Sequence, residues 1–305
     1  MADIMVQADN LVKIYKTDEI EVVALQGLDL SVETGEFMAI IGSSGSGKST
    51  FLNMLGGLDR PSAGKLFVDN KNLFTMSEKE LVDYKRSTVG FVWQNNARNL
   101  LPYLTAYENI CMPMQIASSK EKKERANMLL DLVGLSNKRD NRLASLSGGE
   151  QQRIAIAIAL SNSPKVLLAD EPTGSVDSKT AAYIFDVFNR LNREMGQTII
   201  VVTHDVSLSK KVSRVAAIRD GRISSERILK EDYAERLKEA GDVAADWHEE
   251  ESQEEYAIVD RNGRVQLPRE MLNKLNLSDN KVIIEMADDS IVIKKPSEQE
   301  KKNDQ

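Results

Sequence analysis

The sequence predicts an α/β protein in which helices cover a mainly parallel sheet, followed by a smaller β-rich module. An apolar strand at residues 37–41 leads through a glycine-rich turn into a helix. Two further apolar strands, at 165–172 and 198–202, are separated by a helical stretch at 178–194. Strands that alternate with helices in this way are typical of a parallel sheet. After residue 255 the pattern changes to short strands that flank turns.

The N-terminal part alternates apolar and polar side chains and predicts antiparallel strands. These strands span residues 4–8 and residues 22–25 continuing through 28–32, and Tyr15 is expected in the loop between them. A strand is then expected at 65–69, a helix at 76–84 and a buried strand at 89–93 that ends at Gln94. A helical subdomain is expected from about 95 to 160, with helices at 106–112, 120–133 and 154–160.

The composition, 41% hydrophobic and 29% charged, is ordinary for a globular protein, and 305 residues suggest about two domains. The longest apolar run in the middle of the chain, at 154–160, has seven residues, whereas a membrane helix needs about 20. The N-terminus lacks a basic segment followed by an apolar one, so no secretory signal is expected. The single cysteine, Cys111, excludes an internal disulfide and is expected to be a small buried hydrophobe in a cytoplasmic protein.

The net charge of −7 is confined to the C-terminal part of the chain. Residues 238–305 contain 17 Asp and Glu and 10 Lys and Arg, so residues 1–237 are neutral. Nonspecific nucleic-acid binding depends on the neutralisation of phosphates by basic side chains. The charge distribution therefore argues against nucleic acid as a partner.

The turn after the strand at 37–41 has the spacing of a phosphate-binding loop. It reads Gly42-Ser43-Ser44-Gly45-Ser46-Gly47-Lys48-Ser49-Thr50. Glycines let successive backbone N–H groups point at phosphate oxygens, with a helix N-terminus behind them. In this pattern Lys48 reaches the β- and γ-phosphates, and the Ser49 hydroxyl binds Mg²⁺. The alternative, a Gly/Ser-rich surface loop, does not explain its position between a strand and a helix.

Two adjacent carboxylates, Asp170 and Glu171, lie near the end of the apolar strand at 165–172. Ligands of α/β sheets bind at the carboxyl ends of the strands, so we expect Asp170 to bind Mg²⁺ and Glu171 to act as general base. The alternative is that both cap the turn at Pro172, but buried carboxylates are costly without a cation. Gln94 and His204 end two other strands and are candidates for an extra metal and water ligand and for a γ-phosphate contact.

The segment 146–153, Leu-Ser-Gly-Gly-Glu-Gln-Gln-Arg, lies about 20 residues before Ala-Asp-Glu-Pro at 169–172 and resembles the signature of ABC ATPase cassettes. The resemblance covers residues 1 to about 230, and the predicted cassette domain spans 1–235. It implies an ATPase that uses ATP and Mg²⁺, with a parallel core, an antiparallel β subdomain and a helical subdomain. It also implies that Tyr15 stacks on adenine, and that the phosphate loop, the signature residues Ser147, Gly148 and Gly149, and Asp177 contact the nucleotide. Metal binding is implied for Ser49, Gln94 and Asp170. Catalysis is implied for Glu171, His204 and Gln94.

The same resemblance implies that one cassette is half of a working site. In this family the signature opens a helix that holds the γ-phosphate of ATP bound to the other chain, so a second copy is an expected partner. Residues 99–110 resemble the macrolide-export, lipoprotein-release and cell-division group (MacB-, LolD- and FtsE-like), whose cassettes drive a separately encoded membrane permease. Gln94 and Asn99 are two residues further apart than in that group. The extra residues lie where a cassette of this kind is expected to contact its permease. The expected location is cytoplasmic, peripheral on the inner face of the cell membrane.

Residues 236–255 are rich in Asp and Glu and predict a solvated acidic linker. Beyond the linker, residues 256–259 and 263–267 predict a hairpin, Pro268 begins a helix to about 275, and 281–287 with 290–294 predict a second hairpin. Residues 297–305 predict a charged, disordered tail.

The module at residues 256–296 resembles swapped-hairpin domains of the AbrB/MazE type, which are obligate dimers and in many cases bind DNA. DNA binding would depend on Arg261, Arg264 and Arg269. The module holds seven basic and six acidic side chains, however, and an acidic linker precedes it. We therefore prefer a dimerisation domain that keeps two cassettes at high effective concentration. A soluble ABC ATPase with a regulatory or DNA-binding role remains the alternative.

Overall fold

The computed structural model describes residues 3–16, 20–94, 100–116, 122–205, 212–229, 253–260, 263–267, 269–276 and 282–295. The chain divides into two compact units, Met1–Tyr256 and Ala257–Gln305. The first unit contains two sheets and the main helices, and the second contains a short helix and a hairpin. Among the described residues, no helix combines the length and the apolarity needed to span a membrane.

A four-stranded antiparallel sheet forms the β subdomain, with strand order β2-β1-β4-β5. Its strands are β1 (Ile4–Lys16), β2 (Glu21–Glu33), β4 (Ala63–Val68) and β5 (Lys71–Asn72). The two segments predicted at 22–25 and 28–32 are one strand, because Gly27 (φ 88°) is an extra, bulged residue between two registers of β2. Tyr15 was predicted in a loop, and that was wrong: the tyrosine pairs with Val22 near the end of β1.

The central sheet has seven strands in the order β11-β10-β9-β3-β8-β7-β6. In chain order these are β3 (Phe37–Ile41), β6 (Val89–Val92), β7 (Val166–Asp170), β8 (Thr198–Val202), β9 (Arg214–Arg219), β10 (Arg222–Leu229) and β11 (Gln253–Ala257). Strands β6, β7, β8, β3 and β9 are parallel, which confirms the predicted parallel core. Sequence analysis missed β9 and β10, although Asp220-Gly221, both with positive φ, is the turn that joins them.

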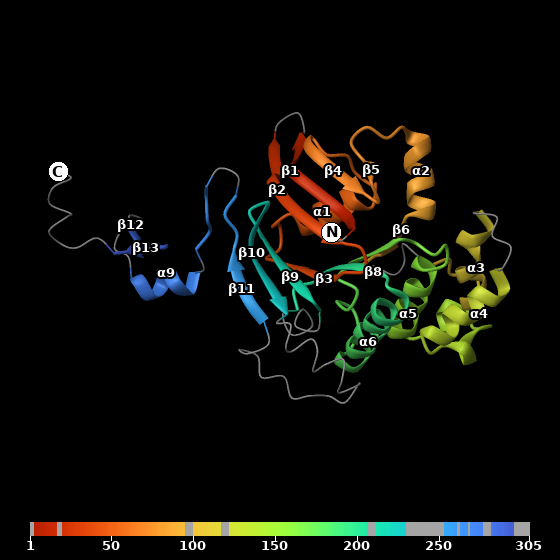
Figure 1. Ribbon diagram of the computed structural model, residues 1–305. Coiled ribbons are helices and arrows are strands. Elements are labelled where there is room, and N and C mark those ends of the chain that lie inside the picture. Colours follow the sequence, from red (N-terminus) through yellow and green to blue (C-terminus); the bar gives the residue numbers. More distant parts are fainter. Residues whose placement is uncertain are drawn as a thin grey trace. The chain divides into compact units, whose positions relative to one another are not determined.

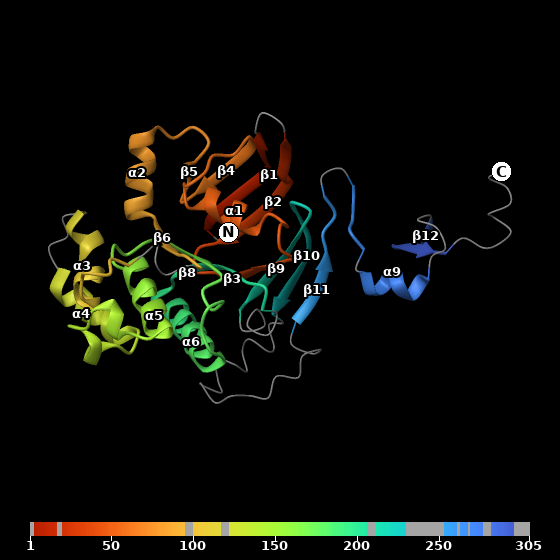
Figure 2. The same ribbon diagram turned by 180° about the vertical axis from the view of Figure 1, so that it is seen from behind.

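Helices lie on both faces of the central sheet (Figures 1 and 2). The helices of the first unit are α1 (Lys48–Leu55), α2 (Glu78–Ser87), α3 (Ala106–Ile116), α4 (Lys122–Leu132), α5 (Gly148–Ala159) and α6 (Ser178–Met195), with 3₁₀ turns at Ser136–Lys138 and Leu143–Ser145. Of these, α3 and α4 pack against α5 rather than on the sheet. Helix α5 begins six residues before the predicted start at 154. The reason is that Ser147 and Glu150 form a capping box, in which each side chain bonds the backbone N–H of the other.

Alternate side chains of β3 point to opposite faces of the central sheet. Phe37, Ala39 and Ile41 pack in the cluster that also contains the apolar faces of α5 and α6. The rings of Phe37 and Phe185, on α6, stack with centroids 6.3 Å apart. Helix α1 lies between the central sheet and the β subdomain (Figure 1). The phosphate loop that precedes α1 is therefore held between two rigid layers.

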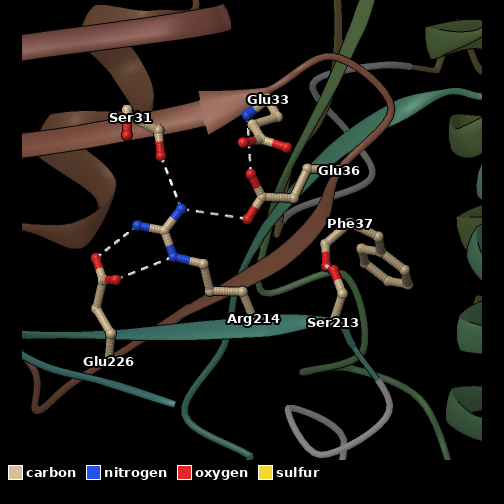
Figure 3. Close-up of polar contacts among 7 residues, drawn as sticks. All are labelled: Ser31, Glu33, Glu36, Phe37, Ser213, Arg214 and Glu226. Carbon is tan, nitrogen blue, oxygen red and sulfur yellow. Dashed lines mark hydrogen bonds and ion pairs between the residues drawn. The ribbon is translucent and has the colours of Figure 1, made fainter. Parts of the chain in front are cut away.

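An ionic cluster ties the β subdomain to the central sheet at the start of β3 (Figure 3). The Arg214 guanidinium donates two hydrogen bonds to Glu226, at 2.7 and 3.1 Å, and others to the Ser31 carbonyl and to Glu36. Burial raises the pKa of the Glu36 carboxyl, while the hydrogen bond from the Glu33 backbone and the charge of Arg214 oppose that rise. The cluster fixes β9, whose other end closes against the phosphate loop.

The second unit contains α9 (Arg269–Leu275) and a hairpin of β12 (Ile283–Ala287) and β13 (Ser290–Lys294), which confirms the second predicted hairpin. The first predicted hairpin, at 256–267, is confirmed only next to its turn, where the Asp260 N–H donates to the Arg264 carbonyl at 2.9 Å. Only one bridge, between Val259 and Val265, forms among its described residues, and residues 253–257 are instead a strand of the central sheet. The remainder of the predicted linker, at 236–252, and the tail at 297–305 lie outside the described residues, as do Arg261 and Pro268.

Candidate nucleotide-binding site

The turn between β3 and α1 has a backbone that only glycine accommodates easily. Gly47 has φ 107°, and a Cβ atom there would lie 2.7 Å from the Ala24 carbonyl oxygen. At Gly42, with φ 154°, a Cβ atom would lie 2.2 Å from the carbonyl oxygen of Ile218 on β9. At Gly42 and Gly47 the loop therefore packs so closely against neighbouring backbone that a side chain is excluded.

The interior of this loop fits a phosphate group. The Lys48 ammonium is buried and donates to the carbonyl oxygens of Gly42 and Ser43, at 2.9 Å each. The Ser46 hydroxyl is also buried and has no hydrogen-bond partner among the residues that the structure describes. A buried ammonium and an unpartnered hydroxyl beside a helix N-terminus are suitable donors for phosphate oxygens.

Two oxygen ligands for a hard cation meet next to the loop. The Ser49 hydroxyl, in the first turn of α1, donates to Asp170 Oδ1 at 3.2 Å. Asp170 is the last residue of β7, which ends two residues before the predicted end at 172. A hydroxyl and a carboxylate beside a phosphate site are the ligands that Mg²⁺ takes in nucleotide-binding proteins.

Glu171 follows Asp170 and turns out of the strand with φ 46°, a left-handed conformation for a residue that is not glycine. Its backbone N–H donates to the Val202 carbonyl at 2.9 Å, so the ends of β7 and β8 are held together. Its carboxylate lies 2.8 Å from His204 Nδ1 and also accepts from the His204 backbone N–H. The structure thus brings Asp170, Glu171 and His204 to one edge of the sheet.

Gln94 lies two residues beyond β6, near the turn that follows Glu171. A Cβ atom built on Gly174 would be 3.7 Å from Glu171 Cβ and 3.8 Å from Gln94 Nε2. The side-chain amide therefore lies beside the carboxylate edge, as predicted. Residues 95–99, which contain the unusual spacing, lie outside the described residues.

The signature residues form a second group, built on the N-termini of α5 and α6. The Ser147 hydroxyl caps α5, and Ser147 and Gly148 are exposed. A side chain added at Gly148 would meet no atom of the described residues within 4 Å, whereas one at Gly149 would meet Thr180 of α6 at 2.7 Å. Thr180 in turn donates to Asp177, the N-cap of α6, at 2.8 Å from its hydroxyl and 3.0 Å from its backbone. These hydrogen bonds hold the pKa of the Asp177 carboxyl below its usual value.

Tyr15 is 40% exposed, and its hydroxyl donates to Asp59 Oδ2 at 2.7 Å. Lys13 Nζ lies 4.7 Å from the centroid of the tyrosine ring. Tyr15 was predicted from the sequence. Lys13, Asp59 and Thr180 were not, because none of these three residues belongs to a motif. Cys111 is buried, as predicted.

Comparison with known proteins agrees with this geometry. A family model described as "ABC transporter" matches residues 25–174. The lipoprotein-releasing system ATP-binding protein LolD 1 of Chlorobium chlorochromatii is 48% identical over 209 residues, which are 68% of this chain and 84% of that protein. An uncharacterized ABC transporter ATP-binding protein of Thermotoga maritima is 47% identical over 213 residues, 69% of this chain and 90% of that protein.

Among solved structures, a dimeric post-hydrolysis state of the ATP-binding cassette MJ0796, bound to ADP and Pi, superposes with a TM-score of 0.69. It is 40% identical in sequence, and the match covers 74% of this chain and 99% of that one. The match to the AbrB/MazE type stays a prediction, whereas the cassette resemblance is confirmed. The chain therefore belongs to the ABC transporter family, in which it is an ATP-binding cassette with ATPase activity.

Proposed function

We propose that this chain is the ATP-hydrolysing subunit of a LolD- or MacB-like export or extraction system. Two copies close head to tail on two ATP molecules and drive a separately encoded membrane permease from the cytoplasmic face, where the chain is peripheral. The observation that carries the proposal is the division of the site into two groups. The phosphate loop and the Asp170–Glu171–His204 edge form one group, and the N-terminus of α5 forms the other.

Within one chain, the phosphate loop and Lys48 bind and orient the triphosphate, while Ser49, Asp170 and Gln94 hold Mg²⁺. When bound, Mg²⁺ neutralises charge on the β- and γ-phosphates. Glu171 takes the proton of the attacking water, and His204 keeps the Glu171 carboxylate oriented and contacts the γ-phosphate. The 2.8 Å contact between the histidine and the carboxylate supports this pairing.

The second copy supplies Ser147, Gly148, Gly149 and Asp177. An exposed helix N-terminus offers backbone N–H groups and a positive dipole end to a phosphate. The open space at Gly148 and the tight packing at Gly149 support an approach of the γ-phosphate over Gly148. The dimeric MJ0796 cassette, at 40% identity, supports the same arrangement.

A mixing experiment tests this arrangement. Lys48→Ala disables the phosphate loop, and Gly148→Asp places a negative charge where the γ-phosphate of the other copy is expected. Each variant alone should be inactive, but a mixed dimer contains one intact site. An equal mixture should therefore recover about a quarter of the wild-type ATPase rate by random pairing. A mixture with no more activity than the separate variants would contradict the head-to-tail dimer.

The permease is the least specified partner. The similarity to LolD 1 supports a lipoprotein-release or related substrate class. A cleft of about 260 Å³ runs between α2, β6, α3 and α5. Phe91 and Trp93 line it, and their rings are tilted by 33° with centroids 4.1 Å apart. We expect a helical segment of the permease to dock there. Co-purification of a polytopic membrane protein with the wild-type chain, lost with Trp93→Ala and kept with Phe74→Ala, tests this assignment.

We also propose that the C-terminal unit joins two copies rather than binding DNA. Of the arginines considered for DNA, Arg264 is engaged with Asp260 at 2.8 Å. The β12–β13 hairpin has one apolar face, where Ile284 pairs with Ile293 and Met286 pairs with Ile291. Ile284, Met286 and Ile291 are 67%, 74% and 67% exposed, which supports a partner on this face. The opposite face carries the Lys294–Glu285 ion pair.

A further inference from the structure

Lys13, Tyr15 and Asp59 form a polar cluster beside the phosphate-loop helix. Lys13 and Tyr15 are two residues apart on β1 and therefore point to the same face of the sheet. Both contact Asp59: Lys13 Nζ lies 2.5 Å from Oδ1, and the Tyr15 hydroxyl donates to Oδ2 at 2.7 Å. Lys13 also donates to the Arg60 carbonyl at 2.9 Å. Each carboxylate oxygen of Asp59 therefore has its own donor.

Lys13 and Asp59 are largely shielded from solvent in this cluster. Lys13 is 9% exposed, which is low for a lysine, and the Asp59 side chain is 27% exposed. Burial alone would raise the pKa of the Asp59 carboxyl, but hydrogen bonds from Lys13 and Tyr15 outweigh it and hold that pKa below its usual value. The carboxylate is thus charged and fully engaged, and it fixes the orientation of the tyrosine ring.

The position of Asp59 connects this ring to the phosphate loop. Helix α1 begins at Lys48, at the end of the loop, and ends at Leu55, four residues before Asp59. Burial and Asp59 raise the pKa of the Tyr15 phenol, and Thr50, in the first turn of α1, opposes that rise. Asp59, the hydrogen-bond acceptor of the phenol, therefore belongs to the segment that carries the phosphate loop. The distance from the ring to the loop is set by short, rigid connections.

The Lys13 ammonium covers one face of the Tyr15 ring. Tyr15 is 40% exposed, which leaves room for an aromatic ligand at the ring. We propose that Asp59 is a positioning residue for the nucleobase: it holds the Tyr15 ring so that a purine stacks on the face opposite Lys13 while the triphosphate lies in the loop. The inference rests on the proposed role of Tyr15 in ATP binding. A ring held in its bound orientation before the nucleotide arrives loses less conformational freedom on binding.

The test compares nucleotide affinity with phosphate affinity in the full-length chain. Tyr15→Phe removes the hydroxyl but keeps the ring and the Lys13–Asp59 pair, and Asp59→Asn removes the charge that both donors share. Each variant should bind MgATP roughly 3- to 10-fold more weakly, as expected for one lost hydrogen bond. Binding of inorganic tripolyphosphate, which has no base, should not change, and kcat at saturating ATP should stay at the wild-type value. In the double variant the two losses should not add.

Glu78→Gln is the matched control, because it breaks the exposed Arg60–Glu78 pair next to Asp59 and should leave ATP affinity unchanged. Tyr15→Ala distinguishes the base-stacking role of Tyr15 from the positioning role of Asp59. If Tyr15→Ala binds ATP as tightly as the wild type, the base-stacking role of Tyr15 is wrong. If Tyr15→Ala weakens ATP binding but Tyr15→Phe and Asp59→Asn do not, only the role of Asp59 is overturned. An equal loss of tripolyphosphate affinity also overturns it; if Asp59→Asn fails to fold, Tyr15→Phe decides.

Discussion

His204 Nδ1 lies 2.8 Å from Glu171 Oε2, and the two residues come from adjacent parallel strands, β8 and β7. Glu171 reaches this position through a left-handed backbone conformation that is unfavourable for residues other than glycine, by about 1 kcal/mol. Its side chain is 13% exposed, while that of His204 is 71% exposed. The histidine therefore contacts the carboxylate from the solvent side, and the backbone after β7 fixes its position from the protein side.

Glu171→Gln should abolish most turnover and preserve nucleotide binding. The amide has the shape of the carboxylate but cannot accept a proton from water, so we expect the ATPase rate to fall by about 10²- to 10⁴-fold. MgATP affinity, measured by isothermal titration, should stay within about twofold of the wild type, because the phosphate loop and Ser49 are unchanged. A variant that still hydrolyses ATP at a tenth of the normal rate or faster would exclude Glu171 as the general base.

Asp170→Asn should act through the metal. The hydrogen bond from the Ser49 hydroxyl can survive, but the site loses one of its negative charges. The Mg²⁺ concentration that gives half-maximal ATPase activity should rise by roughly tenfold or more. Removal of divalent cations with a chelator should stop hydrolysis in the wild-type chain, and Mg²⁺ should restore it. Hydrolysis that continues in the chelator would contradict the metal site at Ser49 and Asp170.

Arg214→Met should destabilise the first unit without touching the nucleotide site. The side chains of Arg214 and Glu226 are 18% and 13% exposed, and loss of the arginine leaves Glu226 and Glu36 without their cation. Breaking a largely buried pair costs about 3 kcal/mol. The free energy of unfolding in urea provides the measurement. Arg190→Met is the control, because the Arg190–Glu194 pair is exposed and its loss should cost less than about 0.5 kcal/mol.

The cost of Arg214→Met should also depend on pH. Burial raises the pKa of Glu36, and Arg214 opposes this, so the folded-state pKa rises further in the variant. A carboxyl with a raised folded-state pKa contributes stability below its unfolded pKa, about 4.3, and that contribution is lost as the pH rises through the folded value. The difference between variant and wild type should therefore grow from pH 4.5 to pH 7.5. A difference that shrinks over this range would show that Glu36 is not the group responsible.

The sequence was sufficient to predict that Asp170, Glu171 and His204 lie together at one edge of the sheet. Asp170, Glu171 and His204 are each preceded by an apolar strand, and parallel strands bring their carboxyl ends to one edge. The same logic could not find Asp59 or Lys13, because their contact joins residues 46 positions apart and no spacing rule relates them. Strands β9 and β10 were missed because arginines and serines interrupt their apolar pattern. The helix start at Gly148 was missed because a capping box lies outside the apolar run.

The apolar face of the β12–β13 hairpin should hold two copies of the chain together in the absence of nucleotide. A unit of 49 residues buries too little apolar surface to be very stable alone, so we expect a second copy to cover Ile284, Met286 and Ile291. Met286→Glu places a charge in that contact and should raise the dimer dissociation constant at least tenfold in sedimentation experiments without ATP. Ala287→Glu adds the same charge to the neighbouring residue of β12, on the opposite face, and should leave the dimer intact. If the wild-type chain is monomeric at tens of micromolar without ATP, or if the two variants behave alike, the hairpin face is not the contact and the cassettes meet only through their nucleotides.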